Sequence, residues 1–458
     1  MEEKIKSIRL TTMQKIALGF FGVILIGGVL LWLPICNTKP IAFIDALFTS
    51  VTAVCVTGLV TITPATQFTL IGKLILLLLI QIGGLGVLAC TMGFMIILKR
   101  QITVRTRVMI QEAYNMDSLS GMVRFMLRVI KGTFFVEGVG AILYATTFVP
   151  KYGWVRGVWY SVFHAISAFC NAGIDILDSD SLTPYVTNPV INFTTMFLIV
   201  AGGLGFIVWY EAGENFRKTV KNHLPITRIF TRLTIHARIV IIMTVLLLTF
   251  GTVVIFALEY RNPETIANLS LGQKVMASMF QSVTLRTAGF ATISQSGMMP
   301  ATKFFNCILM VIGGSPGGTA GGIKTTTVAL LLLTCISEIR GKGKTECMGA
   351  RIAVPVVRTA IVITMITVAF LFVGVMGITI LEPGKNFLDI LYEGSSAIGT
   401  VGLTADLTSS LSRGSHIILM IMMYVGRIGP ITMALVLGGK NDKMANLVDL
   451  PVKRVMVG

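Results

Sequence analysis

The sequence predicts an all-α polytopic membrane protein, in which four pseudo-repeats of span, pore helix, loop and span surround a central pore. Three observations lead to this prediction. Only 13% of the 458 residues are charged, against about 25% in soluble proteins, and the mean hydropathy is +0.82. Eight apolar runs are long enough to cross a bilayer, and a glycine recurs at intervals near 115 residues. So few charges cannot cover a water-exposed surface, so the expected solvent is the bilayer.

The predicted spans, of about 20 residues or more, occur in pairs, and each pair encloses a shorter apolar segment. The spans cover 14–34 and 69–98, 129–149 and 190–210, 238–258 and 303–335, and 354–380 and 415–438. The enclosed segments cover 45–58, 160–173, 276–289 and 389–402, and each ends in a glycine. They are too short to cross the bilayer, which predicts re-entrant pore helices followed by loops.

Aligning these terminal glycines reveals one unit that occurs four times. The aligned segments are FTSVTAVCVTGL (48–59), FHAISAFCNAGI (163–174), MFQSVTLRTAGF (279–290) and YEGSSAIGTVGL (392–403). A second glycine column lies in QIGGLG (81–86), VAGGLG (200–205), VIGGSPGG (311–318) and YVGRIG (424–429). Close helix packing is the expected role of its glycines in the first, second and fourth repeats, which are Gly83, Gly84, Gly202, Gly203 and Gly426. The repeats are therefore assigned to 14–98, 129–210, 238–335 and 354–438, followed by a cytoplasmic tail over 439–458.

The net charge of +17 is unevenly distributed between the two sides of the predicted bundle. The side that holds both termini and the loops between repeats carries 26 basic and 10 acidic residues. The opposite side, from which the re-entrant segments enter, carries 9 basic and 10 acidic residues. By the positive-inside rule, both termini are expected to be cytoplasmic in a multi-pass protein of the cell membrane. The basic charge is thus topological, which argues against a nucleic-acid partner and leaves the lipid bilayer as the surrounding medium.

No enzyme signature emerges from the sequence. The seven cysteines form no CxxC pair, the four histidines form no HExxH, and no cofactor is expected in this chain. Gly317 to Thr325 has one residue too many for the phosphate loop GxxxxGK[ST]. The GxGxxA match from Gly84 to Ala89 lies inside a predicted span. Neither match is expected to bind a nucleotide.

Four glycine-terminated loops at membrane depth predict a lined path for a monovalent cation. Pore helices direct their C-terminal dipole ends inward, and backbone carbonyls next to glycine can replace the hydration shell of an ion. A single glycine would more often serve helix packing, but four in register favour a filter. The predicted filter residues, whose carbonyls would bind the ion, are Val56, Thr57, Gly58, Asn171, Ala172, Gly173, Thr287, Ala288, Gly289, Thr400, Val401 and Gly402.

The loops CVTGL, CNAGI, RTAGF and TVGL resemble those of the Trk/Ktr/HKT superfamily of potassium transporters, most closely the bacterial Ktr membrane subunit. The resemblance covers essentially the whole chain. It implies K+ as the substrate bound at the filter carbonyls, since every filter position is glycine, and it leaves Na+ dependence open. It also implies a homodimer and a separate cytosolic RCK-type ring that binds nucleotide.

The sixth span is interrupted by a glycine-rich stretch that cannot continue a helix. We predict a gate loop there, although the glycines could instead form a rigid kink. Arg427, which is expected to face the pore or this loop, corresponds in the resembling family to an arginine of the pore barrier. The predicted gate residues are Gly313, Gly314, Ser315, Pro316, Gly317, Gly318, Thr319, Ala320, Gly321, Gly322, Lys324 and Arg427.

Three other charged residues lie in or beside the apolar segments. Lys73 is expected to snorkel to the interface and Arg286 to brace the filter from behind, while a pairing of Glu137 with Lys324 is left open. Two functions are considered: a gated, channel-like path for K+, and an alternating-access transporter coupled to Na+ or H+. Four parallel repeats with re-entrant loops favour the first, because alternating-access folds usually show two halves or inverted repeats.

Overall fold

The computed structural model describes residues 12–223 except 88, 91, 93–121, 178 and 179, together with residue 225 and residues 230–429. The predicted tail, 439–458, lies outside these residues, as do parts of two predicted spans, 93–98 and 430–438. The described chain is mostly helical, which confirms the predicted all-α class. Within the described ranges the sheet structure is limited to a hairpin of two short strands, in which Glu346 pairs with Arg351, and to two isolated bridges.

The elements follow the predicted order of long helix, pore helix and second helix. The first repeat contains α1 (Thr12–Trp32), η1 (Pro34–Cys36), α2 (Phe43–Val54), α3 (Pro64–Gln67) and α4 (Leu70–Leu85). The second contains α7 (Met122–Tyr152), α8 (Trp154–Phe169), η2 (Thr183–Tyr185), α9 (Pro189–Gly203) and α10 (Phe206–Lys221). The third contains α12 (Ile235–Glu259), α13 (Leu271–Thr284), α14 (Pro300–Val311), α15 (Thr325–Ile339), β1 (Glu346–Cys347) and β2 (Ala350–Arg351). The fourth contains α16 (Val354–Leu381), α17 (Phe387–Gly399), η3 (Thr408–Ser410) and α18 (Arg413–Ile428).

The first helix of each repeat is long and apolar enough to cross a membrane, whereas the second helix is shorter. α4, α9 and α18 each end just before a glycine with positive φ: Gly86 at +85°, Gly205 at +91° and Gly429 at +97°. Glycine adopts this conformation without the steric cost that other residues incur. The prediction of one continuous span over 190–210 is therefore wrong, because the chain bends by 99° between α9 and α10.

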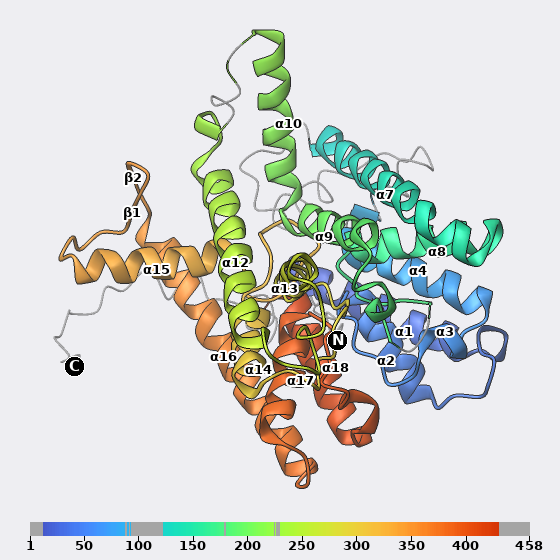
Figure 1. The fold of residues 1–458 in the computed structure, drawn as a ribbon. Coiled ribbons are helices and arrows are strands. Elements are labelled where there is room, and N and C mark those ends of the chain that lie inside the picture. Colours follow the sequence, from blue (N-terminus) through green and yellow to red (C-terminus); the bar gives the residue numbers. More distant parts are fainter. Residues whose placement is uncertain are drawn as a thin grey trace, which may run out of the picture.

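The four repeats follow one another around the centre of the molecule, as the colours in Figure 1 show. The second helix of each repeat contacts the pore helix of the next: α4 packs on α8, α9 on α13, α14 on α17, and α18 on α2. The last contact closes the circle between the fourth and the first repeat. The pore helices α2, α8, α13 and α17 thus lie on the inside, where large buried side chains such as Phe48, Phe169 and Phe280 pack.

In the first, second and fourth repeats, a glycine of the second column brings the second helix against the end of its own pore helix. A Cβ atom added at Gly83 would lie 2.3 Å from the carbonyl oxygen of Val54, at the end of α2. A Cβ atom added at Gly202 would lie 1.9 Å from Phe169 O, and one added at Gly426 would lie 2.1 Å from Ile398 O. Any side chain there would push the pore helix away, so these glycines set the position of the loops that follow.

Candidate filter and gate

The four loops that follow the pore helices meet in a closed ring. Each loop glycine faces the carbonyl oxygen of the residue preceding the glycine in the next loop, and the fourth loop faces the first. An added Cβ atom would lie 2.8 Å from Ala172 O at Gly58, 2.5 Å from Ala288 O at Gly173, 2.5 Å from Val401 O at Gly289 and 2.0 Å from Thr57 O at Gly402. The approach is backbone to backbone, so only glycine fits at each of the four positions.

The ring has a repeating and unusual backbone conformation. In each loop, the residue two positions before the glycine has a positive φ although it carries a side chain: Val56 at +52°, Asn171 at +59°, Thr287 at +69° and Thr400 at +53°. The four glycines also have positive φ, between +62° and +110°. Branched residues in the left-handed region are rare and cost about 1–3 kcal/mol, and such strain is concentrated at functional sites.

Hydroxyl groups at the ends of the pore helices hold the loops in place. Thr52 Oγ1 accepts a hydrogen bond from Gly58 N at 2.9 Å, and Ser396 Oγ accepts one from Gly402 N at 2.9 Å. In the other two repeats the hydroxyl donates to the residue after the glycine: Ser167 Oγ to Ile174 O and Thr284 Oγ1 to Phe290 O, both at 2.7 Å.

The loop amides bond back to the pore helices, which leaves the loop carbonyls without hydrogen-bond donors. Thr57 N donates to Thr52 O, Ala172 N to Ser167 O and Val401 N to Ser396 O, each at 2.8 Å. In the described part of the chain, the carbonyl oxygens of Thr57, Ala172, Ala288 and Val401 accept no hydrogen bond. Buried backbone carbonyls are nearly always paired, so four unpaired ones in one ring indicate a binding partner outside the chain.

A cavity of about 310 Å³ opens beside the ring, and the four loop glycines are part of its lining. Three acidic residues, Asp175, Asp180 and Asp406, also line it. Carboxylates at the entrance to a narrow path raise the local concentration of cations. None of these aspartates is among the residues predicted from the sequence, although each follows a loop glycine by two to seven residues, which is the signal that could have identified them.

Buried polar side chains brace the fourth loop from behind. Glu393, on α17, accepts hydrogen bonds from Ala405 N at 3.1 Å, from Thr408 Oγ1 at 2.6 Å and from the Thr404 hydroxyl. Gln295 bridges two pore helices, because its Oε1 accepts from both Gln281 Nε2 and Tyr392 Oη at 2.8 Å. This network was not predicted from the sequence, where its signal is the presence of polar residues in otherwise apolar pore helices.

The glycine-rich stretch between α14 and α15 forms an irregular loop that is anchored on the second repeat. Ser315 N donates to Gly203 O at 2.9 Å and Thr319 N to Gly202 O at 3.1 Å. Phe206 N, at the start of α10, donates in return to Gly317 O at 3.0 Å. The loop contains all the predicted gate residues except Arg427, and Ser315, Thr319 and Ala320 are buried.

This loop also contacts the fourth repeat, and an arginine of that repeat links the loop to the first. A Cβ atom added at Gly321 would lie 2.1 Å from Thr400 Oγ1 of the fourth filter loop. Arg427, on α18, donates to Thr319 O and also to Gly83 O on α4. A loop that belongs to the third repeat therefore contacts the second and fourth repeats beside the ring, and Arg427 links it to the first.

The remaining charged residues of the membrane region each have a partner. Lys324 Nζ donates to Ala320 O at 2.6 Å, whereas Glu137 accepts from Gln81 Nε2 at 3.1 Å, so the contacts assign the two residues to different partners. Lys73 Nζ donates to Ala65 O at 2.6 Å. Arg286 is buried and donates to Gly313 O at 3.4 Å, which places it between the third pore helix and the start of the gate loop.

Comparisons with known proteins agree with this architecture. Residues 9–443 match the family described as TrkH, cation transport protein. The chain is 38% identical to Ktr system potassium uptake protein B of Bacillus subtilis, with 94% of each chain covered. It is 36% identical to potassium/sodium uptake protein NtpJ of Enterococcus hirae, with 100% of this chain and 99% of the relative covered. The crystal structure of the potassium transporter TrkH from Vibrio parahaemolyticus has the same fold, with a TM-score of 0.71, 17% identity, and 95% and 87% of the two chains covered.

Proposed function

Because this chain belongs to the TrkH family of cation transport proteins, we propose that it is the membrane subunit of a potassium uptake system, with the ring of four loops as its selectivity filter. It is a multi-pass membrane protein, and potassium is its substrate rather than a resident cofactor. The relatives named above as uptake proteins for potassium, or for potassium and sodium, support this assignment.

The observation that carries the proposal is the ring of four unpaired carbonyl oxygens, at Thr57, Ala172, Ala288 and Val401. Carbonyl oxygens held in a rigid ring replace the water molecules around an alkali ion, and neutral oxygens suit a monovalent ion better than a divalent one. The predicted filter residues include these four and their neighbours, so filter selectivity comes from the backbone. Sodium, as a second transported or activating ion, is included in the proposal because one relative is named for both ions.

We assign residues 313–322, with Lys324 and Arg427, to the gate. The support is geometric: the loop lies against Thr400 of the proposed filter and is hydrogen-bonded to α9, to α10 and to Arg427 of α18, which also donates to Gly83 O on α4. Two cationic side chains beside the path would oppose the passage of K+ while the loop stays in this position. Displacement of the loop opens the path.

The assembly and the orientation complete the proposal. Two relatives are named as proteins B and D of a Ktr system, a name that implies further components and supports a separate cytosolic regulatory ring that binds nucleotide. The positive-inside rule places both termini and the basic loops on the cytoplasmic side, where such a ring would dock. A homodimer with one pore in each chain is part of the same proposal.

The filter assignment is tested by ion-specific uptake in potassium-uptake-deficient cells that express the wild type or Gly402→Ser. We expect the wild type to prefer K+ over Na+ and the variant to lose this preference, because the added side chain would displace Thr57 O. Gly272→Ser is the matched control, since a Cβ there meets no atom within 4 Å. An equal preference in all three proteins would contradict the filter, and uptake that strictly requires a second ion would favour an alternating-access transporter.

A further inference from the structure

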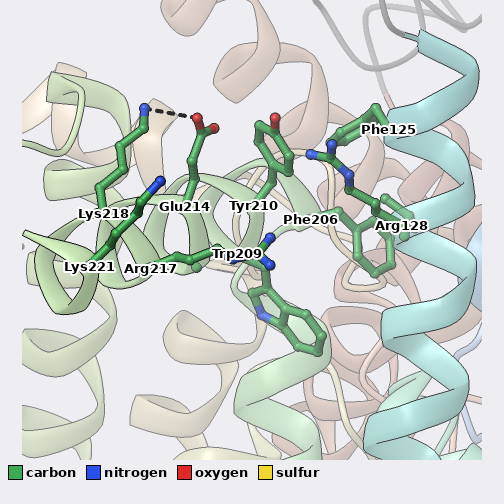
Figure 2. A pocket seen from close by; sticks show the side chains of 11 residues that line it. Phe125, Arg128, Phe206, Trp209, Tyr210, Glu214, Arg217, Lys218 and Lys221 are labelled. Carbon is green, nitrogen blue, oxygen red and sulfur yellow. Dashed lines mark ion pairs between the residues drawn. The ribbon is translucent and has the colours of Figure 1, made fainter.

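A cleft of about 610 Å³ lies between the beginning of α7 and α10, away from the filter. Figure 2 shows its walls: Phe125 and Arg128 come from α7, and the amphipathic helix α10 contributes a row that includes Trp209, Arg217 and Lys221. The volume is within the range of small-molecule binding sites. The lining combines aromatic rings with several cations, which is the chemistry of a site for a phosphate attached to an apolar group.

The cleft has more positive charge than its own carboxylate can balance. Glu214 pairs with Lys218 at 2.8 Å (Figure 2). Arg128, Arg217 and Lys221 have no carboxylate within ion-pair distance among the described residues. The Arg128 guanidinium instead lies 4.9 Å from the centre of the Tyr210 ring, a cation–π contact that holds it at the edge of the cleft. Three cations from two helices thus remain available for an anion.

The position of the cleft along α7 places it at the membrane surface. α7 is one of the helices long enough to cross a bilayer, and it exposes large apolar side chains, among them Phe134, Phe135 and Ile142. Arg128 precedes Phe134 by six residues, or about 9 Å of helix. The cations therefore lie beside the first lipid-facing turns of α7, at the depth of lipid headgroups. Trp209 and Tyr210 are residue types typical of that interface.

The cleft is also connected to the gate loop. Phe206, which lines the cleft, donates its amide hydrogen to Gly317 O at 3.0 Å. The ring of Trp209 packs edge to face on Phe169, at the end of the second pore helix, with 5.7 Å between the ring centres. Gly205 approaches the loop so closely that an added Cβ would lie 2.5 Å from Pro316 O. A movement of α10 relative to α7 would therefore be transmitted directly to the loop.

We propose that this cleft binds the phosphate headgroup of an anionic membrane lipid, with Arg128, Arg217 and Lys221 as the phosphate ligands and the aromatic rings against the lipid's apolar part. Basic pockets between membrane helices on the cytoplasmic side bind such headgroups. A phosphate held from both α7 and α10 fixes α10 and, through the Phe206 to Gly317 hydrogen bond, favours the gate-loop position described above. This second step rests on the proposed function, whereas the binding step does not.

Binding is measured on the full-length purified protein by native mass spectrometry, with phosphatidylglycerol and phosphatidylcholine as the two probes. The test variant carries Arg128→Gln, Arg217→Gln and Lys221→Gln together, and we expect its affinity for phosphatidylglycerol to fall roughly 100-fold. The control variant loses the same charge elsewhere, through Arg340→Gln, Lys344→Gln and Arg351→Gln, which are exposed and do not line the cleft. It should bind like the wild type.

Several outcomes would overturn the proposal. Equal binding of phosphatidylglycerol by the test variant and the wild type would exclude the cleft as the site, and so would equal loss in both variants. Inorganic phosphate at millimolar concentration provides a third arm: if it protects the wild type against thermal unfolding, without lipid, as well as phosphatidylglycerol does, the ligand is a soluble phosphate and the lipid assignment is wrong. No protection by inorganic phosphate supports the lipid.

Flux tests the second step separately. In proteoliposomes, K+ flux through the wild type should fall as phosphatidylglycerol replaces phosphatidylcholine, and flux through the test variant should not respond. A lipid response that is the same in both proteins would overturn the link to the gate loop. The variants retain every residue of the filter, so a failure of the filter assignment would appear as lost ion preference, independently of any lipid response.

Discussion

The filter ring and the gate loop lie next to each other but are built in opposite ways. Each of the four repeats contributes an equivalent three-residue loop to the ring, and the four loop glycines approach backbone atoms of the neighbouring loops. The gate loop belongs to the third repeat alone, and side chains such as Arg427 and Thr319 help to hold it in place. A ring of backbone contacts cannot accept an additional atom, whereas a loop held by a few hydrogen bonds can be released. On the proposed function, selectivity would depend on the fourfold repetition of one loop, and gating would depend on the one repeat that departs from it.

The largest effect is expected from one methyl group added to the ring. A Cβ at Gly402 would lie 2.0 Å from Thr57 O and 2.7 Å from Gly58 Cα, so the first and fourth loops would have to separate. Gly402→Ala should lower the initial rate of K+ uptake roughly 100-fold, which corresponds to about 2.7 kcal/mol. A Cβ atom added at Gly58 would lie 2.8 Å from its nearest neighbour, so Gly58→Ala should lower the rate of K+ uptake by a smaller factor. The opposite order of the two rates would contradict the ring geometry.

Removal of the gate loop should raise K+ flux, whereas a methyl group in the ring should lower K+ uptake. Deleting Gly314 to Gly321 removes the contacts with Thr400 and with Arg427, and we expect K+ flux in proteoliposomes to rise at least about tenfold. Size-exclusion chromatography and the midpoint of thermal unfolding would establish that the deletion variant is folded. Unchanged or lower flux in a folded deletion variant would show that the glycine-rich stretch is a rigid kink.

A smaller increase in K+ flux is expected when only Arg427 is replaced. Arg427→Gln loses charge-assisted hydrogen bonds to Thr319 O and Gly83 O, each worth about 1.5–3 kcal/mol, and also removes a cation from the path. Flux should rise by about threefold to tenfold, because the loop keeps its anchors on α9. Arg413→Gln, an exposed change at the beginning of the same helix, is the control. If both variants behave like the wild type, Arg427 does not restrain the gate.

The smallest effect is expected from one hydroxyl behind the ring. Ser396→Ala removes the acceptor of the Gly402 amide and should lower the free energy of unfolding by about 1 kcal/mol. Because the fourth loop loses only one of its restraints, the preference for K+ over Na+ should fall by a small factor and not vanish. Thr379→Ala removes a hydroxyl that bonds only within α16, and it should leave the ion preference unchanged. A complete loss of preference in Ser396→Ala would mean that the ring depends on its hydroxyl restraints more than on its glycines.

Most of the fold was predictable because the signals that define it are local. The apolar runs, the short enclosed segments and the glycine register predicted the helical membrane fold, and the family match confirms the resemblance noted in the four loops. The break between α14 and α15 was also predicted, since six glycines and Pro316 within ten residues cannot form a helix. The breaks at Gly86, Gly205 and Gly429 were missed, because a single glycine in an apolar run does not reveal the sign of its φ.

The sequence by itself determined which residues could approach closely, and the tertiary structure decided what they approach. Hydropathy is a local property and the repeat spacing can be counted along the chain, so the sequence alone predicted four units with glycines at equivalent positions. The partners were not, because they lie in other repeats: Gly402 faces Thr57 O, Arg427 joins Thr319 to Gly83, and Asp175 and Asp406 line the same cavity. These pairs are separated by more than 100 residues, and only the closing of the fourth repeat on the first brings the ends of the pattern together.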